Sequence, residues 1–190
     1  MKSQRDLEKI ATQARIVDAA LQLFETTGYE TTSMARIARD ANTSRANLYL
    51  HFTSKSQIVL HRMRSLEPEV LALYNGLDTV SATHDCVKDW LRQAGQLWLR
   101  HLTEFDAISR AMTTDDEVFQ EWLDLHHRIS AQLADRLPAG AMSGARREVH
   151  LVTLMISLEQ NFYFLYVRGR RDREELVLNS LATQWLTLLT

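Results

Sequence analysis

Apolar residues return at helical spacing through almost the whole chain. Met34, Ile37, Ala38 and Ala41 fall at i, i+3, i+4 and i+7, which is the spacing of one buried helix face. The same period predicts further helices over residues 5–27, 45–50, 55–66, 84–102, 105–112 and 143–167, one from the capping box at 114–117 to a stop at Pro138, and a last one carrying Leu178 to Leu189. The predicted fold class is therefore all-α.

Residues 31–55 hold two short helices joined by a tight turn. Ser33 and Ser44 each precede one of them, and a serine hydroxyl accepts an N–H that the first helical turn leaves free. Asn42 lies in the turn, and asparagine tolerates the left-handed conformation better than most residues. A capping box, Ser54 to Gln57, opens the longer helix that follows. This order of elements is the helix-turn-helix arrangement.

The second short helix presents a polar first turn. Leu48 and Phe52 are predicted to face inward, whereas Arg45, Ala46 and Asn47 face outward. Arginine pairs with guanine through two hydrogen bonds, and asparagine pairs with adenine in the same way. The outward arginine and asparagine are therefore the best candidates for reading bases.

The net charge of −2 is unevenly distributed along the chain. Residues 1–64 have 10 Lys and Arg against 6 Asp and Glu, a balance of +4, whereas residues 65–190 have 12 against 18, a balance of −6. A basic segment on an otherwise acidic chain suits phosphate binding, because the remainder of the chain does not adhere to DNA.

The sequence gives little support to a secreted protein or a membrane protein. Cys86 is the only cysteine, so no intrachain disulfide can form. The first residues lack the apolar region of a signal peptide, and no apolar run is long enough to span a membrane, so we expect a cytoplasmic protein without a membrane partner.

An enzyme is the least supported class. His126 and His127 lie near Glu121 and Asp124, but adjacent residues point in different directions on a helix and give no clean set of metal ligands. No nucleophile elbow, phosphate loop or Cys/His pair is present. We expect no catalysis, no metal and no cofactor.

Short motifs follow one another in a fixed order between residues 16 and 60. They are AAxxLF at Ala19 to Phe24, Gly28-Tyr29, Thr32-Ser33, Ile37-Ala38, Ser44, Asn47-Leu48-Tyr49, His51-Phe52 and Ser54-Lys55. In order and spacing these motifs resemble the DNA-binding domain of the TetR family of transcriptional regulators. The chain departs from the family pattern at Asn42, where a glycine is usual, and at Leu50, where an aromatic residue or histidine is common.

The resemblance implies both a domain organisation and a function. A three-helix helix-turn-helix DNA-binding domain over residues 1–55 would be followed by a helical effector-binding and dimerisation domain over 56–190. The protein would be a repressor that binds a palindromic operator as a homodimer and is released by a small-molecule effector. The alternative is a helical interaction or ligand-binding protein without sequence-specific DNA binding.

The predicted DNA contacts lie in and around the helix-turn-helix. Hydroxyl groups and helix N-terminal N–H groups reach phosphates, while the exposed first turn reads bases. The resemblance adds Tyr49 and Lys55 as phosphate clamps, with His51 assisting. The full predicted set is Ser33, Thr43, Ser44, Arg45, Ala46, Asn47, Tyr49, His51 and Lys55.

The predicted helix over 143–167 is apolar on more than one face, so it needs two partners. The resemblance implies that the last two helices form a four-helix bundle with a second copy of the chain. The alternative is that this helix is the central one of a monomeric bundle.

Two further features concern the C-terminal region. Pro68 lacks an N–H and is predicted to kink or end the helix that starts at Lys55, either as a hinge or as a simple helix end. Aromatic and methionine residues on neighbouring helices, with a few polar tips, predict an effector pocket. Its candidates are Trp90, Trp98, Phe105, Met112, Trp122, His126, Phe162 and Tyr166.

Overall fold

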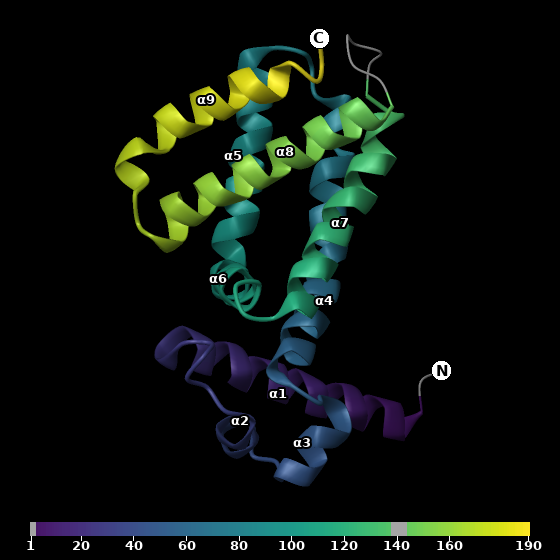
Figure 1. The fold of residues 1–190 in the computed structure, drawn as a ribbon, viewed down its shortest axis with the longest axis vertical. Coiled ribbons are helices and arrows are strands. Elements are labelled where there is room, and N and C mark those ends of the chain that lie inside the picture. The colour runs from purple at the N-terminus through teal and green to yellow at the C-terminus, as the bar shows by residue number, and fades with distance from the viewer. Residues whose placement is uncertain (1–2, 138–143) are drawn as a thin grey trace. The chain divides into compact units, whose positions relative to one another are not determined.

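The computed structural model describes residues 3–137 and 144–190, and within these ranges the chain forms helices and no strand (Figure 1). This confirms the all-α prediction. The α-helices are α1 (Gln4–Thr27), α2 (Met34–Asp40), α3 (Arg45–His51), α4 (Lys55–Asn75), α5 (His84–Arg100), α6 (Leu102–Ala111), α7 (Asp116–Ala134), α8 (Ala145–Phe162) and α9 (Glu174–Leu186), with short turns η1 (Leu77–Thr79), η2 (Tyr163–Val167) and η3 (Arg171–Arg173).

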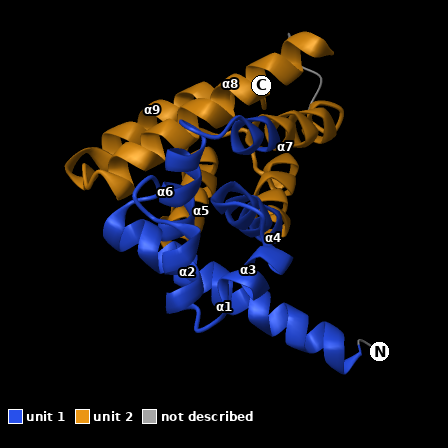
Figure 2. Ribbon diagram, turned by 60° about the horizontal axis from the view of Figure 1, so that its bottom comes forward, with its two compact units in different colours: residues 1–66, 103–121 blue, residues 67–102, 122–190 orange. Residues whose placement is uncertain are grey.

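The chain divides into two compact units (Figure 2). The first contains residues 1–66 and 103–121, and the second contains residues 67–102 and 122–190. The chain passes between them within α4, after Leu102 and within α7. The predicted domain boundary at residue 55 follows the end of the helix-turn-helix and stays a prediction.

The first unit is built around α1. Gly28 has φ 91° and ends this helix by donating its N–H to the carbonyl of Phe24 at 3.0 Å, as its freedom at positive φ predicts. Most apolar positions of α1 to α4 are almost fully buried, as the pattern predicts: Ile16, Ala20, Leu23, Phe24, Ile37, Ala38, Ala41, Leu48, Phe52, Ile58 and Val59. Met34, which begins the predicted face of α2, is only half-buried.

Pro68 lies inside α4 and does not end it. The prediction of a helix end there is therefore wrong. Proline removes one backbone hydrogen bond and crowds the preceding turn, but Pro68 is exposed, so solvent reaches the turn that it disturbs. A hinge at this position stays a prediction.

The second unit has an aromatic centre. The rings of Trp90 on α5 and Trp185 on α9 lie 4.8 Å apart, and Tyr74 of α4 contacts both. The indole N–H of Trp90 donates to the carbonyl of Leu73 at 3.0 Å. Other apolar residues at helical spacing on α5 are buried as well: Val87, Leu91, Ala94, Leu97 and Trp98.

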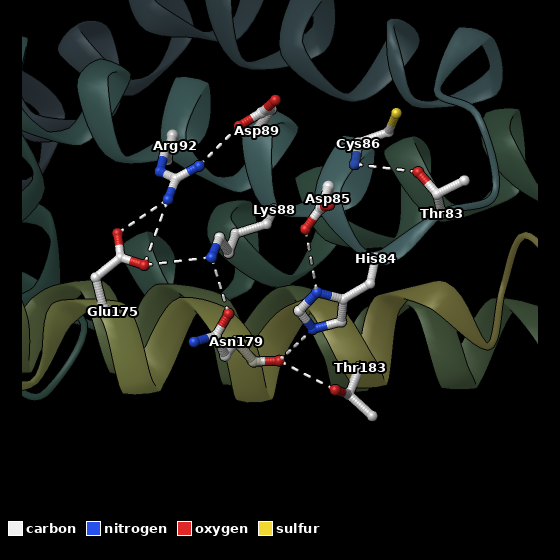
Figure 3. A network of polar contacts seen from close by, with 10 residues as sticks. All are labelled: Thr83, His84, Asp85, Cys86, Lys88, Asp89, Arg92, Glu175, Asn179 and Thr183. Atoms are coloured by element: carbon white, nitrogen blue, oxygen red, sulfur yellow. Dashed lines mark hydrogen bonds and ion pairs between the residues drawn. The ribbon is translucent and has the colours of Figure 1, made fainter.

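Polar contacts also join α5 to α9 (Figure 3). Glu175 accepts hydrogen bonds from Arg92 at 3.0 and 3.3 Å and forms an ion pair with Lys88 at 3.3 Å. Lys88 also donates to the side-chain oxygen of Asn179 at 3.0 Å. The basic residues of α5 therefore fix the position of the acidic first turn of α9.

The helix predicted over 143–167 is divided. It runs as α8 from Ala145 to Phe162 and continues as the wider π-helical turn η2, while Ser143, like Pro138, lies outside the described residues. Its apolar residues do occupy more than one face: Val149 is 67% exposed and Ile156 39% exposed. The opposite face is buried and includes Leu151, Leu154, Met155 and Leu158.

A methyl group at position 95 should destabilise the second unit. A Cβ atom on the buried Gly95 would lie 2.4 Å from the hydroxyl oxygen of Tyr166, which donates to Glu174 at 2.9 Å. Overpacking of this kind costs about 1–3 kcal/mol, and the better helix propensity of alanine returns about 1 kcal/mol. We expect Gly95→Ala to lose about 1 kcal/mol in urea unfolding, and a Tyr166→Phe background to reduce that loss; an equal loss in both backgrounds would rule out the clash as its cause.

Candidate nucleic-acid interface

The two short helices of the helix-turn-helix begin at the predicted serines. The hydroxyl oxygen of Ser33 accepts the N–H of Arg36 at 3.3 Å, and that of Ser44 accepts the N–H of Asn47 at 3.0 Å. Asn42 has φ 50°, so the turn keeps its left-handed residue without the usual glycine. Local sequence signals therefore determine the start of both helices and the turn between them.

A β-branched residue in this turn should be costly. The left-handed conformation costs most residues about 1–2 kcal/mol, and asparagine is among the few that adopt it routinely. Asn42→Val should therefore lower the unfolding free energy by about 1–2 kcal/mol in urea titration, whereas Asn42→Gly should stay within about 0.5 kcal/mol of the wild type. Equal losses in both variants would show that the side chain of Asn42, and not its backbone conformation, is needed.

The recognition helix α3 separates an inward and an outward face. Leu48 is 0% exposed, whereas Arg45 and Ala46 are exposed and Asn47 is half-buried. The amide nitrogen of Asn47 donates to the hydroxyl of Thr43 at 2.8 Å. This bond fixes the orientation of the amide, whose carbonyl oxygen and second hydrogen can still face a base edge.

The remaining part of α3 is partly open. Tyr49 is 45% exposed and Leu50 is 82% exposed, so both side chains are accessible to a partner. His51 is half-buried, and its Nδ1 atom has no hydrogen-bond partner in the described residues. Arg36 on α2 is a further candidate DNA contact that the sequence analysis missed. Among the described residues, its Nε atom is also buried without a hydrogen-bond partner. Its position three residues after the cap Ser33, in the first turn of α2, could have indicated it.

Lys55 is turned toward the protein. Its ammonium nitrogen donates to the carbonyl oxygens of Tyr29 at 2.7 Å and Glu30 at 3.2 Å, and lies 4.6 Å from the centre of the Tyr29 ring. Burial lowers the pKa of Lys55, although the negative charges of Asp115 and Glu30 oppose this shift. The predicted phosphate contact of Lys55 stays a prediction.

The two predicted capping boxes, at Ser54 to Gln57 and at residues 114–117, have hydrogen bonds that differ from the predicted ones. The hydroxyl of Ser54 accepts the N–H of Gln57 at 3.2 Å, but the amide of Gln57 donates to Glu117 at 2.6 Å instead of returning to Ser54. At the start of α7, the hydroxyl of Thr114 donates to the carbonyl of Ala111 at 3.3 Å. In both places one side chain of the predicted box forms a hydrogen bond with a residue outside the box.

The predicted effector residues are divided between the two units, and their role as a pocket lining stays a prediction. Phe105 and Met112 belong to the first unit, and the other six belong to the second. In the second unit, the Phe162 ring lies 6.1 Å from that of Trp98 and 5.3 Å from that of Tyr166. The rings of Trp122 and His126 lie 4.2 Å apart.

A groove of about 410 Å³ opens between α4 and α5 within the second unit. It is lined by other residues than the predicted ones: Glu69, Ala72, Leu73, Gln93, Gln96, Leu97 and Arg100. In the described part of the chain, no three His, Cys, Asp or Glu side chains are grouped to hold a metal ion. The described helices include none with the length and apolar character needed to cross a membrane.

Part of the chain resembles a known family in sequence, and the chain resembles solved structures in fold. Residues 16–61 match the family model of the bacterial regulatory proteins of the tetR family. A structure from Syntrophomonas wolfei, described as a TetR-family transcriptional regulator, has a TM-score of 0.75 at 16% identity and covers 95% of this chain and 97% of its own. A similarly described protein from Mesorhizobium loti has a TM-score of 0.63 at 17% identity, over 97% and 96%.

A third structure was solved with a ligand. It is FadR of Thermus thermophilus, a TetR-family repressor in complex with lauroyl-CoA, with a TM-score of 0.53 at 19% identity over 93% of this chain and 92% of its own. No curated protein matches this chain. The TM-scores show a shared fold, and the sequence match to the family concerns residues 16–61. The chain thus carries the DNA-binding helix-turn-helix of the TetR family over residues 16–61 and has the fold of that family's transcriptional regulators, which confirms the predicted resemblance.

Proposed function

We propose that this protein is a repressor that binds a palindromic operator as a homodimer and leaves it when a small effector binds. The observation that carries the proposal is the exposed first turn of α3, with Arg45 and Asn47 placed above the buried Leu48. A short helix capped at Ser44 and held from beneath by its core residue presents these two side chains in a fixed register.

The proposed contacts divide by chemistry. Arg45 and Asn47 read base edges, with Ala46 close to the groove between them. The hydroxyls of Ser33, Thr43 and Ser44 and the exposed Tyr49 contact phosphates, assisted by His51. Leu50, 82% exposed, is suited to an apolar contact with a thymine methyl group, in place of the phosphate or base contact expected of the aromatic residue or histidine that is common at this position.

The proposed dimer uses α8 and α9. Apolar side chains are exposed on these helices and on the turn that follows α8: Val149, Ile156, Phe164 and Leu176. One recognition helix makes few base contacts, so a specific site requires two of them about 34 Å apart on one face of the DNA. A two-fold dimer supplies that arrangement.

The proposed effector site lies in the domain over 56–190. The Thermus thermophilus structure contains lauroyl-CoA, and a fold shared with it supports a small-molecule site in this chain without fixing its chemistry. We propose that the lining comes from the predicted aromatic set within the second unit, with the groove between α4 and α5 as the second candidate.

The alternative function is a helical ligand-binding or interaction protein without sequence-specific DNA binding. Such a protein has no need of an exposed arginine and a half-buried asparagine on the first turn of a capped recognition helix. Its effector or partner would bind equally well whether or not Arg45 and Asn47 were present.

Selection from genomic DNA tests the proposal. The purified protein is incubated with fragmented genomic DNA at near-physiological salt, and the retained fragments are sequenced beside those of an Arg45→Ala, Asn47→Ala double variant. We expect enrichment of one palindrome by the wild type, and a loss of about 100-fold or more in the variant, since each bidentate contact contributes about 1–3 kcal/mol. Weak retention without a motif, equal in both proteins, would leave only phosphate binding and refute the proposal.

A further inference from the structure

The two ends of the helix-turn-helix are tied to each other. Tyr29 and Glu30 precede α2, and Lys55 follows α3. The ammonium group of Lys55 donates to the backbone carbonyls of both earlier residues, at 2.7 and 3.2 Å, and covers the ring of Tyr29. One side chain thus closes the segment between residues 29 and 55 into a loop.

Each end is also bonded to the start of α7. The hydroxyl of Tyr29 donates to the carboxylate of Asp115, and the amide of Gln57 donates to Glu117 at 2.6 Å. Tyr29 is 2% exposed, and its ring packs edge-on against Phe24 with 5.0 Å between centres. Because both ends are attached, a displacement of the first turn of α7 moves the helix-turn-helix as one body.

The charges keep Lys55 directed inward. Burial raises the pKa of Tyr29, and Asp115 raises it further, so the hydroxyl keeps the proton that it donates. Asp115 also attracts the ammonium group, whose pKa is lowered by burial. A lysine that already interacts with two carbonyls, an aromatic ring and a nearby carboxylate gains less free energy from a contact with a DNA phosphate, because it must give up these interactions.

We propose that Lys55, Tyr29 and Asp115 are positioning residues for DNA binding, which orient the helix-turn-helix on residues 103–121 without touching DNA. This inference rests on the proposed function and replaces the phosphate clamp that the family resemblance implies for Lys55. The helix α7 runs from Asp116 to Ala134 and continues beyond the first unit into the second. A movement of its part in the second unit can therefore be transmitted along the helix to Asp115.

The salt dependence of DNA binding tests the role of Lys55. The DNA is the fragment that the wild type retains in the genomic selection, and its affinity is measured between about 50 and 200 mM salt. A lysine on a phosphate contributes about 1 to the slope of log affinity against log salt. We expect Lys55→Met and Tyr29→Phe each to bind about 10-fold more weakly with the wild-type slope. A slope reduced by about 1 in Lys55→Met would overturn the inference.

A matched control separates positioning from general stability. Glu121→Gln removes the charge from the 2.9 Å pair with Arg64, which joins the same helices α4 and α7 in the same unit without involving Lys55, Tyr29 or Asp115. We expect wild-type DNA affinity in this variant. An equal loss of affinity in Glu121→Gln and Tyr29→Phe would mean that the cluster is only structural.

Hydrogen exchange tests the cluster without DNA. Tyr29→Phe, or Asp115→Asn if that variant does not fold, should exchange faster in residues 28–57 and 112–118 and remain unchanged in α9. Unchanged exchange in the first two segments would overturn the inference. If the wild type enriches no DNA motif, the proposed function fails, whereas the exchange result still decides whether the cluster ties these segments together.

Discussion

Replacing Glu159 by glutamine should change how the stability of this protein depends on pH. We expect the difference in unfolding free energy between wild type and Glu159→Gln to be about 3 kcal/mol near pH 5.5 and about 1 kcal/mol near pH 9, because the broken interaction is a buried ion pair only where His126 is charged. Urea titrations across this range measure the difference directly.

The expectation follows from the surroundings of His126, which is 2% exposed. Its Nδ1 atom faces the carbonyl of Trp122 at 2.7 Å, and its Nε2 atom faces a carboxylate oxygen of Glu159 at 3.0 Å. The other oxygen of Glu159 accepts the indole N–H of Trp122 at 2.9 Å. A carbonyl cannot donate a proton, so Nδ1 carries one, and the carboxylate favours a second on Nε2. Burial alone would lower the pKa of His126, but Glu159 and the Trp122 carbonyl outweigh it, and the pKa is raised.

The direction of the pH dependence is fixed by that shift. A raised histidine pKa stabilises the folded state in full below the unfolded value of about 6.5, and this contribution is lost as the pH rises through the folded pKa. In Glu159→Gln burial dominates, the pKa falls below the unfolded value, and the variant loses stability as the pH falls. His127→Gln is the control, since the neighbouring His127 is exposed and should leave the profile unchanged. Parallel curves for wild type and Glu159→Gln would contradict the charged pair.

Features that depend on a few neighbouring residues were predictable. The end of α1 at Gly28, the caps Ser33 and Ser44 and the left-handed Asn42 each depend on groups within four residues. Serine caps and left-handed turn residues act through their own backbone, so the sequence determines them before any tertiary contact forms. This is why the surface of the recognition helix could be described from sequence alone.

Features that depend on distant residues were not predictable. Gln57 completes its hydrogen bonds with Glu117, 60 residues away, and Tyr29 does so with Asp115, 86 residues away. The local pattern at Ser54 to Gln57 fits a capping box equally well, and only tertiary packing decides between the two. For the same reason the inward direction of Lys55 and the continuation of α4 through Pro68 could not be read from the motifs.

An aspartate at position 156 should dissociate the proposed dimer and, with it, remove operator binding. Ile156 lies two helical turns after Val149 on the exposed side of α8, with Phe164 and Leu176 exposed beyond it. A carboxylate buried against a second copy without a partner costs several kcal/mol, so we expect the dimer dissociation constant to rise at least about 100-fold. Sedimentation at micromolar concentration measures the assembly, and titration of the selected palindrome measures DNA affinity.

Loss of the dimer should be separable from loss of the fold. Ile156 is 39% exposed in the single chain, so an aspartate there should leave the helical content intact and should lower affinity for a palindrome much more than for a single half-site, since only the palindrome gains from two linked recognition helices. Leu7→Asp, a matched change at an apolar residue of α1 that is 51% exposed, should preserve both the dimer and its affinity. A wild type that sediments as a monomer would instead make the apolar face of α8 ordinary surface and would remove the two-fold basis for reading a palindrome.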